Sequence, residues 1–256
     1  MQSLPLSEQV VVVSGASRGL GAAIARAFGR EGARVVVNWF RSEEAAHAVA
    51  AHIGDSALPV RADVRDRTEV DRMIETARAH FGAPVSTLVH NALIDFRFDA
   101  ANRPTAADIT WDAYRDQVDG AVHGALNLVQ ACLPGMRDLG SGRVVAIGSN
   151  LVHNPVVPYH DYTTAKAALL GFVRNMAAEL GPEGITVNMV SGGLLRTTDA
   201  SAATSDAVFD IIEGSTPLRR VTTPEDLADT AVFFASPWAR AVTGQDLVVD
   251  GGLVMR

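Results

Sequence analysis

The sequence has 256 residues, 20% of them charged and 48% hydrophobic, a balance typical of a globular protein rather than a disordered one. Its net charge of −7, with no cluster of lysine and arginine to offset it, argues against a nucleic-acid or anionic-membrane partner. The single cysteine, Cys132, rules out an internal disulfide and fits a reducing compartment. It lies in an apolar stretch, so we expect a buried structural thiol.

The start of the chain and its apolar runs predict a soluble cytoplasmic protein. The stretch MQSLPLSEQ lacks the basic region followed by an apolar segment that a signal peptide has. No apolar run approaches the roughly 20 residues that a membrane-spanning helix needs.

Short β-branched runs alternate with longer alanine-rich amphipathic segments along the whole chain. In chain order the predicted elements are strand 10–13, helix 21–31, strand 34–37, helix 43–52, strand 58–61, helix 68–81, strand 87–90, helix 114–136, strand 143–147, helix 162–179, strand 186–190, helix 224–234 and strand 246–249. Continuous apolar strands separated by helices indicate a mostly parallel sheet covered on both faces. Because no linker-like tract or internal repeat divides the chain, we expect one doubly wound α/β domain over residues 1–256.

Two predicted connections, 93–111 and 192–223, are too long to be plain turns. Long ordered connections in compact domains are usually functional and often cover a site. We therefore expect both of them to shape a substrate pocket.

The first predicted strand runs directly into a glycine-rich turn and then an alanine-rich helix. Such a turn brings backbone N–H groups and the positive end of the helix against a pyrophosphate. The alternative is a tight turn that needs glycine only for its positive φ. The position of the turn in the first βα unit favours a nucleotide. The residues expected to contact it are Gly15, Ser17, Arg18, Gly19, Leu20 and Gly21.

The end of the second strand predicts which dinucleotide binds. NAD-binding folds usually place an acid there to hold the adenosine ribose 2′-hydroxyl, but this chain has Asn38, and Arg41 follows three residues later. Arg18 lies inside the glycine turn. Two cations without a carboxylate suit a 2′-phosphate, so we favour NADP(H) over NAD(H). The alternative is a pair of solvated arginines.

The segment 149–166 holds the candidate catalytic residues. Tyr162 and Lys166 are four residues apart on a predicted helix and therefore share a face. An unperturbed phenol has a pKa of about 10, and a nearby ammonium is expected to lower that pKa enough for proton transfer. Ser149 follows the strand 143–147, at the edge where doubly wound sheets bind ligands. Tyr159 has Thr163 at the same spacing and gains no such partner.

Together, the glycine turn, the serine after a middle strand and the Tyr-x-x-x-Lys spacing resemble the short-chain dehydrogenase/reductase family over essentially the whole chain. Further resemblance lies in Asp63-Val64, Asn91-Ala92, Val187-Asn188 and the run from Thr243 to Gly252. Within the family the chain is most similar to the 3-oxoacyl-acyl-carrier-protein reductases.

The resemblance implies one Rossmann-type domain and a role for each matched residue. Tyr162 would be the general acid in reduction and the base in oxidation, Lys166 would lower its pKa and hold the nicotinamide ribose, and Ser149 would orient the substrate oxygen. Asp63 and Val64 would hold the adenine, and Asn91 and Ala92 would flank the adenosine ribose. After Gly193, Thr197 would contact the nicotinamide carboxamide. The resemblance also implies a homotetramer built from the two long helices and the C-terminal strand.

The chain departs from the family pattern at several positions. Ala121 stands where the family has a catalytic asparagine, His90 and Leu93 alter the usual Asn-Asn-Ala-Gly, and Ser191 replaces the proline before Gly192. The connection 93–111 is longer than usual. Its Phe96, Arg97, Phe98 and Arg103 are expected to line the substrate entrance.

We predict an NADPH-dependent carbonyl reductase whose first candidate substrate is a 3-oxoacyl thioester, with acyl carrier protein as a possible partner. A secondary-alcohol, sugar or hydroxysteroid dehydrogenase is the alternative within the family. A nucleotide-binding sensor or scaffold with decayed catalysis is the alternative of another class, because of Ala121. His153 and His160 are interpreted as pocket or surface residues, and no cluster has metal-ligand spacing, so metal-free chemistry is expected.

Overall fold

In the part of the chain that the structure describes, seven strands form a single parallel sheet, as the continuous apolar runs predict. The computed structural model describes residues 3–196 and 198–255. The strands are β1 (Val10–Val13), β2 (Arg34–Trp39), β3 (Ala57–Arg61), β4 (Thr87–His90), β5 (Gly142–Ser149), β6 (Ile185–Gly192) and β7 (Asp246–Val249). Their order in the sheet is β3-β2-β1-β4-β5-β6-β7, and every neighbouring pair is parallel.

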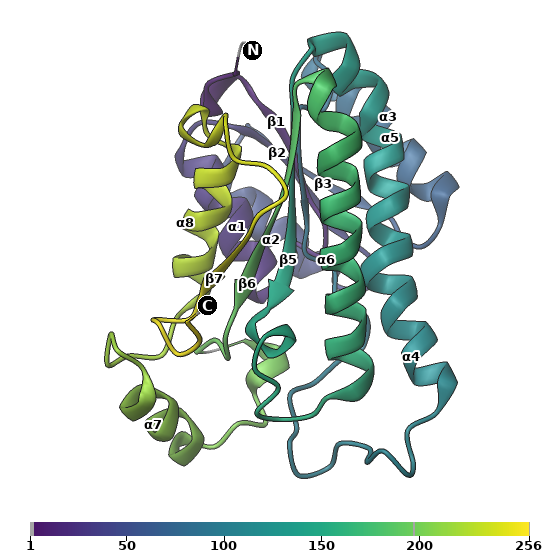
Figure 1. The fold of residues 1–256 in the computed structure, drawn as a ribbon. Helices are drawn as coiled ribbons and strands as arrows, with labels where there is room; N and C mark the ends of the chain where they lie inside the picture. The colour runs from purple at the N-terminus through teal and green to yellow at the C-terminus, as the bar shows by residue number, and fades with distance from the viewer. Residues whose placement is uncertain (1–2, 197, 256) are drawn as a thin grey trace.

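Helices cover both faces of this sheet (Figure 1). They are α1 (Gly19–Arg30), α2 (Glu43–Ile53), α3 (Arg67–Phe81), α4 (Trp111–Val118), α5 (Gly124–Leu139), α6 (His160–Leu180), α7 (Asp206–Ser215) and α8 (Pro224–Ala235). One hydrophobic cluster joins α1, α2 and α8 to side chains such as Val11 and Val13. The other joins α3, α5 and α6 to Val10 and Val12, so alternate residues of β1 belong to opposite layers.

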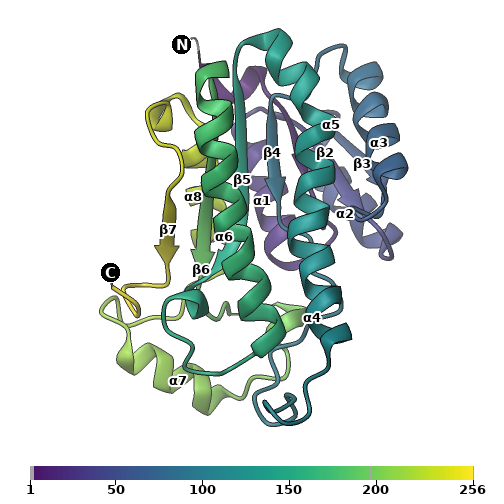
Figure 2. The same cartoon turned by 45° about the vertical axis from the view of Figure 1, so that its right-hand side comes forward.

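The strand order reverses at β1, which pairs with β2 on one side and β4 on the other. In doubly wound sheets, ligands bind at the carboxyl ends of the strands next to such a reversal. The long connection between β4 and α4 and the segment that carries α7 both lie at that end, at the bottom of Figures 1 and 2. The two connections predicted to shape a site therefore lie where a site is expected.

The structure differs from the predicted elements in two places. The single helix predicted over 114–136 is divided into α4, a π-helical segment (Asp119–His123) and α5. The buried side chain of His90, at the end of β4, hydrogen-bonds the carbonyl of Ala121 in this segment. A Cβ on Gly120, in the same segment, would lie 2.3 Å from Ile94. Close approach of this kind locally changes the winding of a helix. Helix α7 was not predicted because it is short and buries only one side chain, Phe209.

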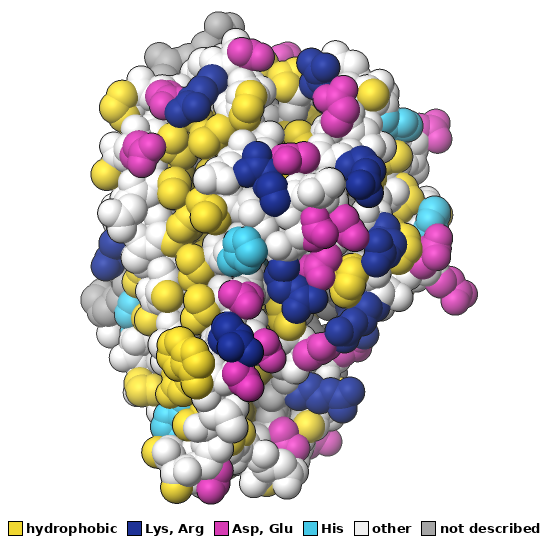
Figure 3. All heavy atoms as spheres, turned by 90° about the vertical axis from the view of Figure 1, so that its right-hand side faces the viewer, with side chains coloured by type: hydrophobic (Ala, Val, Ile, Leu, Met, Phe, Trp, Pro, Cys, Tyr) yellow, Lys and Arg dark blue, Asp and Glu magenta, His cyan; other side chains and the backbone are white. Residues whose placement is uncertain are grey.

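In residues 3–196 and 198–255, no helix is both long and apolar enough to span a bilayer. Figure 3 shows the face over α3, α4 and α5, where acidic and basic side chains are interspersed. Cys132 lies buried on α5, and burial raises the pKa of its thiol to about 12, which confirms a buried structural thiol.

Candidate active site

The glycine turn forms a close-packed cradle at the start of α1. Gly15 and Gly19 have φ values of +63° and +53°, which favour glycine. A Cβ on Gly15 would lie 2.9 Å from the Ala92 Cα, and one on Gly21 would lie 2.2 Å from the Gly15 oxygen. Arg18, the N-cap residue of α1, makes no side-chain capping hydrogen bond. Because the positive end of α1 is exposed and the glycines have no side chains to fill the turn, the turn fits a pyrophosphate.

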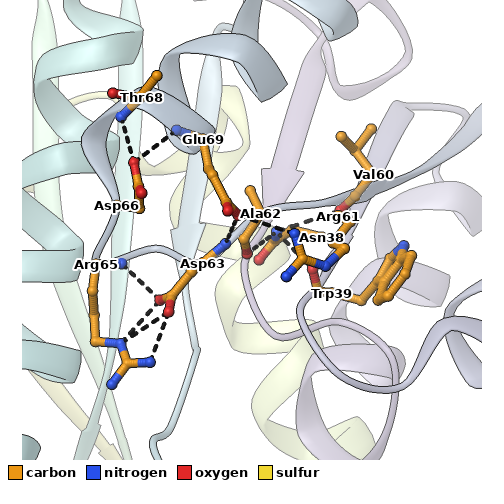
Figure 4. Close-up of polar contacts among 10 residues, drawn as sticks. All are labelled: Asn38, Trp39, Val60, Arg61, Ala62, Asp63, Arg65, Asp66, Thr68 and Glu69. Carbon is orange, nitrogen blue, oxygen red and sulfur yellow. Dashed lines mark hydrogen bonds and ion pairs between the residues drawn. The ribbon is translucent and has the colours of Figure 1, made fainter.

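Asn38 holds this cradle from the second strand. Its Oδ1 accepts a hydrogen bond from the Gly15 N–H at 3.2 Å, and its Nδ2 donates to the carbonyls of Ala62 and Val60 (Figure 4). Asn38 is only 2% exposed. Its side chain is thus committed to the protein backbone, where it joins the turn to the end of β3.

Asp63 follows β3 at the rim of the same groove. Its carboxylate accepts hydrogen bonds from the backbone N–H and the guanidinium of Arg65, at 2.7 to 3.2 Å (Figure 4). These bonds hold the pKa of Asp63 below its usual range. Arg65 was not among the predicted site residues, and its i+2 spacing from Asp63 is the sequence signal for this pair.

A groove of about 760 Å³, here called the cofactor groove, runs from the glycine turn to the end of β5. The predicted contacts that line it are Gly15, Ser17, Arg18, Gly19, Leu20, Gly21, Asn38, Arg41, Asp63, Val64, Asn91, Ala92, Tyr162, Lys166 and Gly193. Thr197 lies outside the described residues. Lining residues that were not predicted include Phe40, Ser42 and Leu195.

The two arginines predicted to hold a 2′-phosphate both reach this groove, and both are paired with acids. Arg18 pairs with Asp199 at 3.1 Å, and Arg41 pairs with Asp95. All four side chains are more than 60% exposed. The acids come from the two long connections and were not predicted, because nothing in the sequence places those connections over the arginines.

Ser149, Tyr162 and Lys166 meet at the carboxyl end of β5, and each is at most 6% exposed. Ser149 ends the strand, while Tyr162 and Lys166 lie on α6. The Lys166 Nζ donates to the Ile147 carbonyl at 2.7 Å and lies 5.7 Å from the centroid of the Tyr162 ring. The α6 helix therefore brings the two side chains together. Lys166 is also the only lysine in the sequence.

The pKa values differ from the prediction. The lysine was expected to lower the pKa of Tyr162, but burial raises it to about 12, opposed only in part by hydrogen bonding to Ser149. Burial also lowers the pKa of Lys166 to about 8. The loss of hydration on burial is therefore the main influence on the pKa of each group, larger than the attraction between phenolate and ammonium.

Phe96 and Phe98, here called the aromatic cap, cover Tyr162. The Phe96 ring stacks on the Tyr162 ring with centroids 4.5 Å apart and planes 19° apart, and the Phe98 ring lies edge-on at 5.3 Å. Both phenylalanines belong to the connection between β4 and α4. Leu151 and Tyr159 complete the cluster around Tyr162.

A second cavity, of about 320 Å³, lies beyond the aromatic cap. Ser149 and Tyr159 line it, whereas Tyr162 and Lys166 line the cofactor groove. Phe98 borders both cavities, and Arg97 lines the groove rather than the second cavity. Most of the second cavity is apolar, with Leu151, Val156, Val157, Leu194, Val208, Ile212 and Leu253 in its wall.

Two departures from the family pattern contact each other. The His90 Nε2 lies 3.0 Å from the Ala121 carbonyl oxygen, and its Nδ1 lies 3.2 Å from the Ser14 Oγ. The same Ser14 oxygen accepts hydrogen bonds from the backbone N–H groups of Asn91 and Ala92. His90 thus connects the edge of the cofactor groove to the π-helical segment.

The other two histidines considered are not part of the groove. His153 lies 2.7 Å from Asp246 at the start of β7, a carboxylate that no sequence spacing indicates. His160 begins α6 and lines neither cavity.

Comparison with known proteins gives the family. A family model described as enoyl-(acyl carrier protein) reductase matches residues 15–254. The chain is 37% identical to a 3-oxoacyl-[acyl-carrier-protein] reductase of Synechocystis over 98% of both chains. It is 36% identical to an L-rhamnose 1-dehydrogenase (NAD(P)(+)) of Azotobacter vinelandii over 97% of both.

A crystal structure of a dehydrogenase/reductase from Sinorhizobium meliloti has the same fold. The TM-score is 0.85 at 31% identity, over 99% of this chain and 97% of the other. With the Rossmann-type sheet and the arrangement of Ser149, Tyr162 and Lys166, these matches lead to one conclusion: the chain belongs to the short-chain dehydrogenase/reductase family of oxidoreductases.

Proposed function

We propose that the protein is an NADPH-dependent carbonyl reductase. The observation that carries this proposal is the meeting of Ser149, Tyr162 and Lys166 at the end of β5, beside a groove that begins at a glycine cradle. Such an arrangement supports proton transfer to an oxygen next to a bound dinucleotide.

The bound nicotinamide cofactor supplies the hydride for the ketone carbon. The Tyr162 hydroxyl donates the proton to the resulting oxygen, and the Ser149 hydroxyl orients that oxygen by a hydrogen bond. The Lys166 ammonium lies beside the tyrosine ring and stabilises the phenolate left after proton transfer. The cradle at Gly15 and Gly21 orients the dinucleotide.

The preference for NADP(H) is supported by Arg18 and Arg41 at the adenosine end of the groove and by Asn38 in place of an acid. A guanidinium binds a phosphate through two parallel hydrogen bonds, and a carboxylate at position 38 would repel that phosphate.

A 3-oxoacyl thioester is the proposed substrate, with acyl carrier protein as the partner that delivers it. The support is the relative named for that activity and the aliphatic wall of the second cavity, which suits an acyl chain. Oxidation of a sugar, as in the name of the rhamnose dehydrogenase, is the second candidate. The aliphatic wall favours the acyl substrate, because a sugar hydroxyl buried against it would lack a partner.

We also propose a homotetramer. Trp111 at the start of α4 is 72% exposed and Trp238 before β7 is 79% exposed, and an assembly over the long helices and the last strand would cover both. Light scattering of the purified protein tests this, and a monomer would contradict it.

The reaction is tested by following NADPH consumption with a short 3-oxoacyl thioester. Tyr162→Phe should lower kcat/KM by about 100- to 10,000-fold, because it removes the proton donor, while NADPH binding measured by calorimetry is kept. Tyr114→Phe is the matched control, because Tyr114 lines neither cavity, and it should retain most of the activity. A parent protein that binds NADPH but reduces no ketone in a broad panel would contradict the proposal and favour a nucleotide sensor.

A further inference from the structure

Each of the two long connections forms an ion pair with one arginine of the cofactor groove. Asp95 of the first connection pairs with Arg41, and Asp199 of the second pairs with Arg18. The Phe98 N–H also donates to the Ala200 carbonyl at 2.9 Å, which joins the two connections to each other. Each arginine is thus paired with one connection, and the two connections are bonded to each other.

Asp95 is the residue directly before the aromatic cap. Its φ of +40° lies in the left-handed region that few non-glycine residues adopt. The ion pair with Arg41 supports this conformation, and the conformation directs the next residue, Phe96, onto the Tyr162 ring. The ion pair with Arg41 and the stacking on Tyr162 are therefore made by adjacent residues.

In this arrangement the aromatic cap covers the ring of Tyr162. Tyr162 is 6% exposed beneath it, and Ser149 faces a different cavity from Lys166. A ketone that contacts both the Tyr162 hydroxyl and the nicotinamide end of the groove would occupy the space over the Tyr162 ring that Phe96 and Phe98 fill. The aromatic cap must leave before the reaction can occur.

We propose that Asp95 is a specificity-determining residue that makes uncovering of Tyr162 depend on the 2′-phosphate of the cofactor. A 2′-phosphate bound by Arg41 displaces the Asp95 carboxylate, and the segment carrying Phe96 then moves off the Tyr162 ring. This inference rests on the proposed preference for NADP(H). It predicts that NAD(H), which lacks the phosphate, occupies the groove without uncovering the tyrosine.

Displacement by phosphate is favoured by charge. A phosphate monoester carries about −1.5 to −2 charges at neutral pH, more than the single charge of a carboxylate, and offers three acceptor oxygens to a guanidinium. The Arg41–Asp95 pair is exposed on both sides, at 64% and 63%, so water screens it and a stronger anion can replace it.

The test places an indole in the aromatic cap with Phe96→Trp and follows its fluorescence and its quenching by acrylamide. The parent, which has 3 tryptophans, supplies the background spectrum to subtract. Adenosine 2′,5′-bisphosphate carries the 2′-phosphate but no nicotinamide, and adenosine 5′-monophosphate lacks that phosphate. The bisphosphate should shift the indole emission to longer wavelength and increase quenching. The monophosphate should bind without shifting the indole emission or increasing its quenching, and calorimetry would measure that binding.

A second variant tests the competition directly. Asp95→Asn keeps a side chain that tolerates positive φ but removes the charge. It should uncover the indole without ligand and tighten bisphosphate binding by about two- to fivefold, the range expected for loss of an exposed ion pair. Asp108→Asn is the matched control on the same connection, because Asp108 accepts a hydrogen bond from Thr105 rather than pairing with an arginine, and it should change neither value.

Equal responses to the two nucleotides, or an unchanged bisphosphate affinity in Asp95→Asn, would overturn the inference. So would bisphosphate binding that leaves the indole covered. If the bisphosphate does not bind, the NADP(H) preference and this inference fail together. If the fluorescence response occurs but no ketone is reduced, the proposed reaction alone fails.

Discussion

The carboxyl edge of the sheet and the connection between β4 and α4 lie against each other but are held in different ways. At the edge, buried side chains such as Asn38, Ser14 and Lys166 bond to backbone atoms whose positions the sheet fixes. The connection is held by an exposed ion pair at Asp95 and by the contacts of the aromatic cap. The edge is therefore expected to be rigid and the connection movable, which is the division that a site with a removable cover requires.

The largest expected effect of a substitution tests the rigidity of the edge. Gly21→Ala should destabilise the protein by about 3 kcal/mol or more, because the new Cβ would lie 2.2 Å from the Gly15 oxygen and neither backbone segment can move freely. Urea denaturation measures this. Gly171→Ala on α6, where a Cβ meets nothing within 4 Å, is the control and should stabilise by about 0.5–1 kcal/mol.

A buried hydroxyl should matter almost as much. Ser14→Ala leaves the N–H groups of Asn91 and Ala92 without their acceptor, so a loss of about 2–4 kcal/mol in the free energy of unfolding is expected. Ser215→Ala removes an exposed hydroxyl that bonds within its own helix, and should change stability by less than about 0.5 kcal/mol. Equal effects of the two substitutions would contradict the importance assigned to the edge.

The pH dependence sharpens the comparison at Lys166. Its pKa is about 8 in the fold against 10.5 in an unfolded chain, so between these values the unfolded state holds more protons and stability should rise with pH. Tyr162 acts oppositely: with a pKa of about 12 instead of 10, it should lower stability as pH rises from 10 to 12. Lys166→Met should abolish the rise in stability between pH 8 and pH 10.5, as measured by denaturation curves recorded across that range.

Because the chain has one lysine, lysine-selective ¹³C labelling reports the titration of this amine alone. A midpoint near the ordinary value of 10.5 would contradict the burial seen here.

The smallest effect is expected in the connection. Arg41→Ala removes an exposed ion pair and should leave the thermal unfolding midpoint unchanged within experimental error, because water screens such pairs. A clear loss of stability would mean that the connection is part of the rigid framework. The control is Arg78→Ala, which breaks an exposed pair with Glu75 on α3.

The difference between the two regions also explains what the sequence could predict. The alternation of strands and helices, the glycine turn and the spacing of Tyr162 and Lys166 are local patterns. They predicted the strands, the turn and the position of Lys166 beside Tyr162, but not the division of the helix over 114–136 or helix α7. The pairing of Arg41 with Asp95 and the position of Phe96 on Tyr162 depend on how a long irregular connection folds back, which no short-range pattern encodes. The raised pKa of Tyr162 was missed for the same reason, because Phe96 and Phe98 of that connection help to bury its ring.

His90 has a consequence for the direction of hydrogen bonding at the edge. The Ala121 carbonyl only accepts, so the Nε2 of His90 carries the ring hydrogen and its Nδ1 is an acceptor. The Ser14 hydroxyl must then donate to Nδ1, and its oxygen accepts from the Asn91 N–H. Burial lowers the pKa of His90 to about 3, so this imidazole keeps one tautomer across physiological acidity. The Asn91 N–H, Ser14, His90 and the Ala121 carbonyl therefore form a chain of hydrogen bonds in which each donor points toward Ala121, and this direction is kept when the medium becomes acidic.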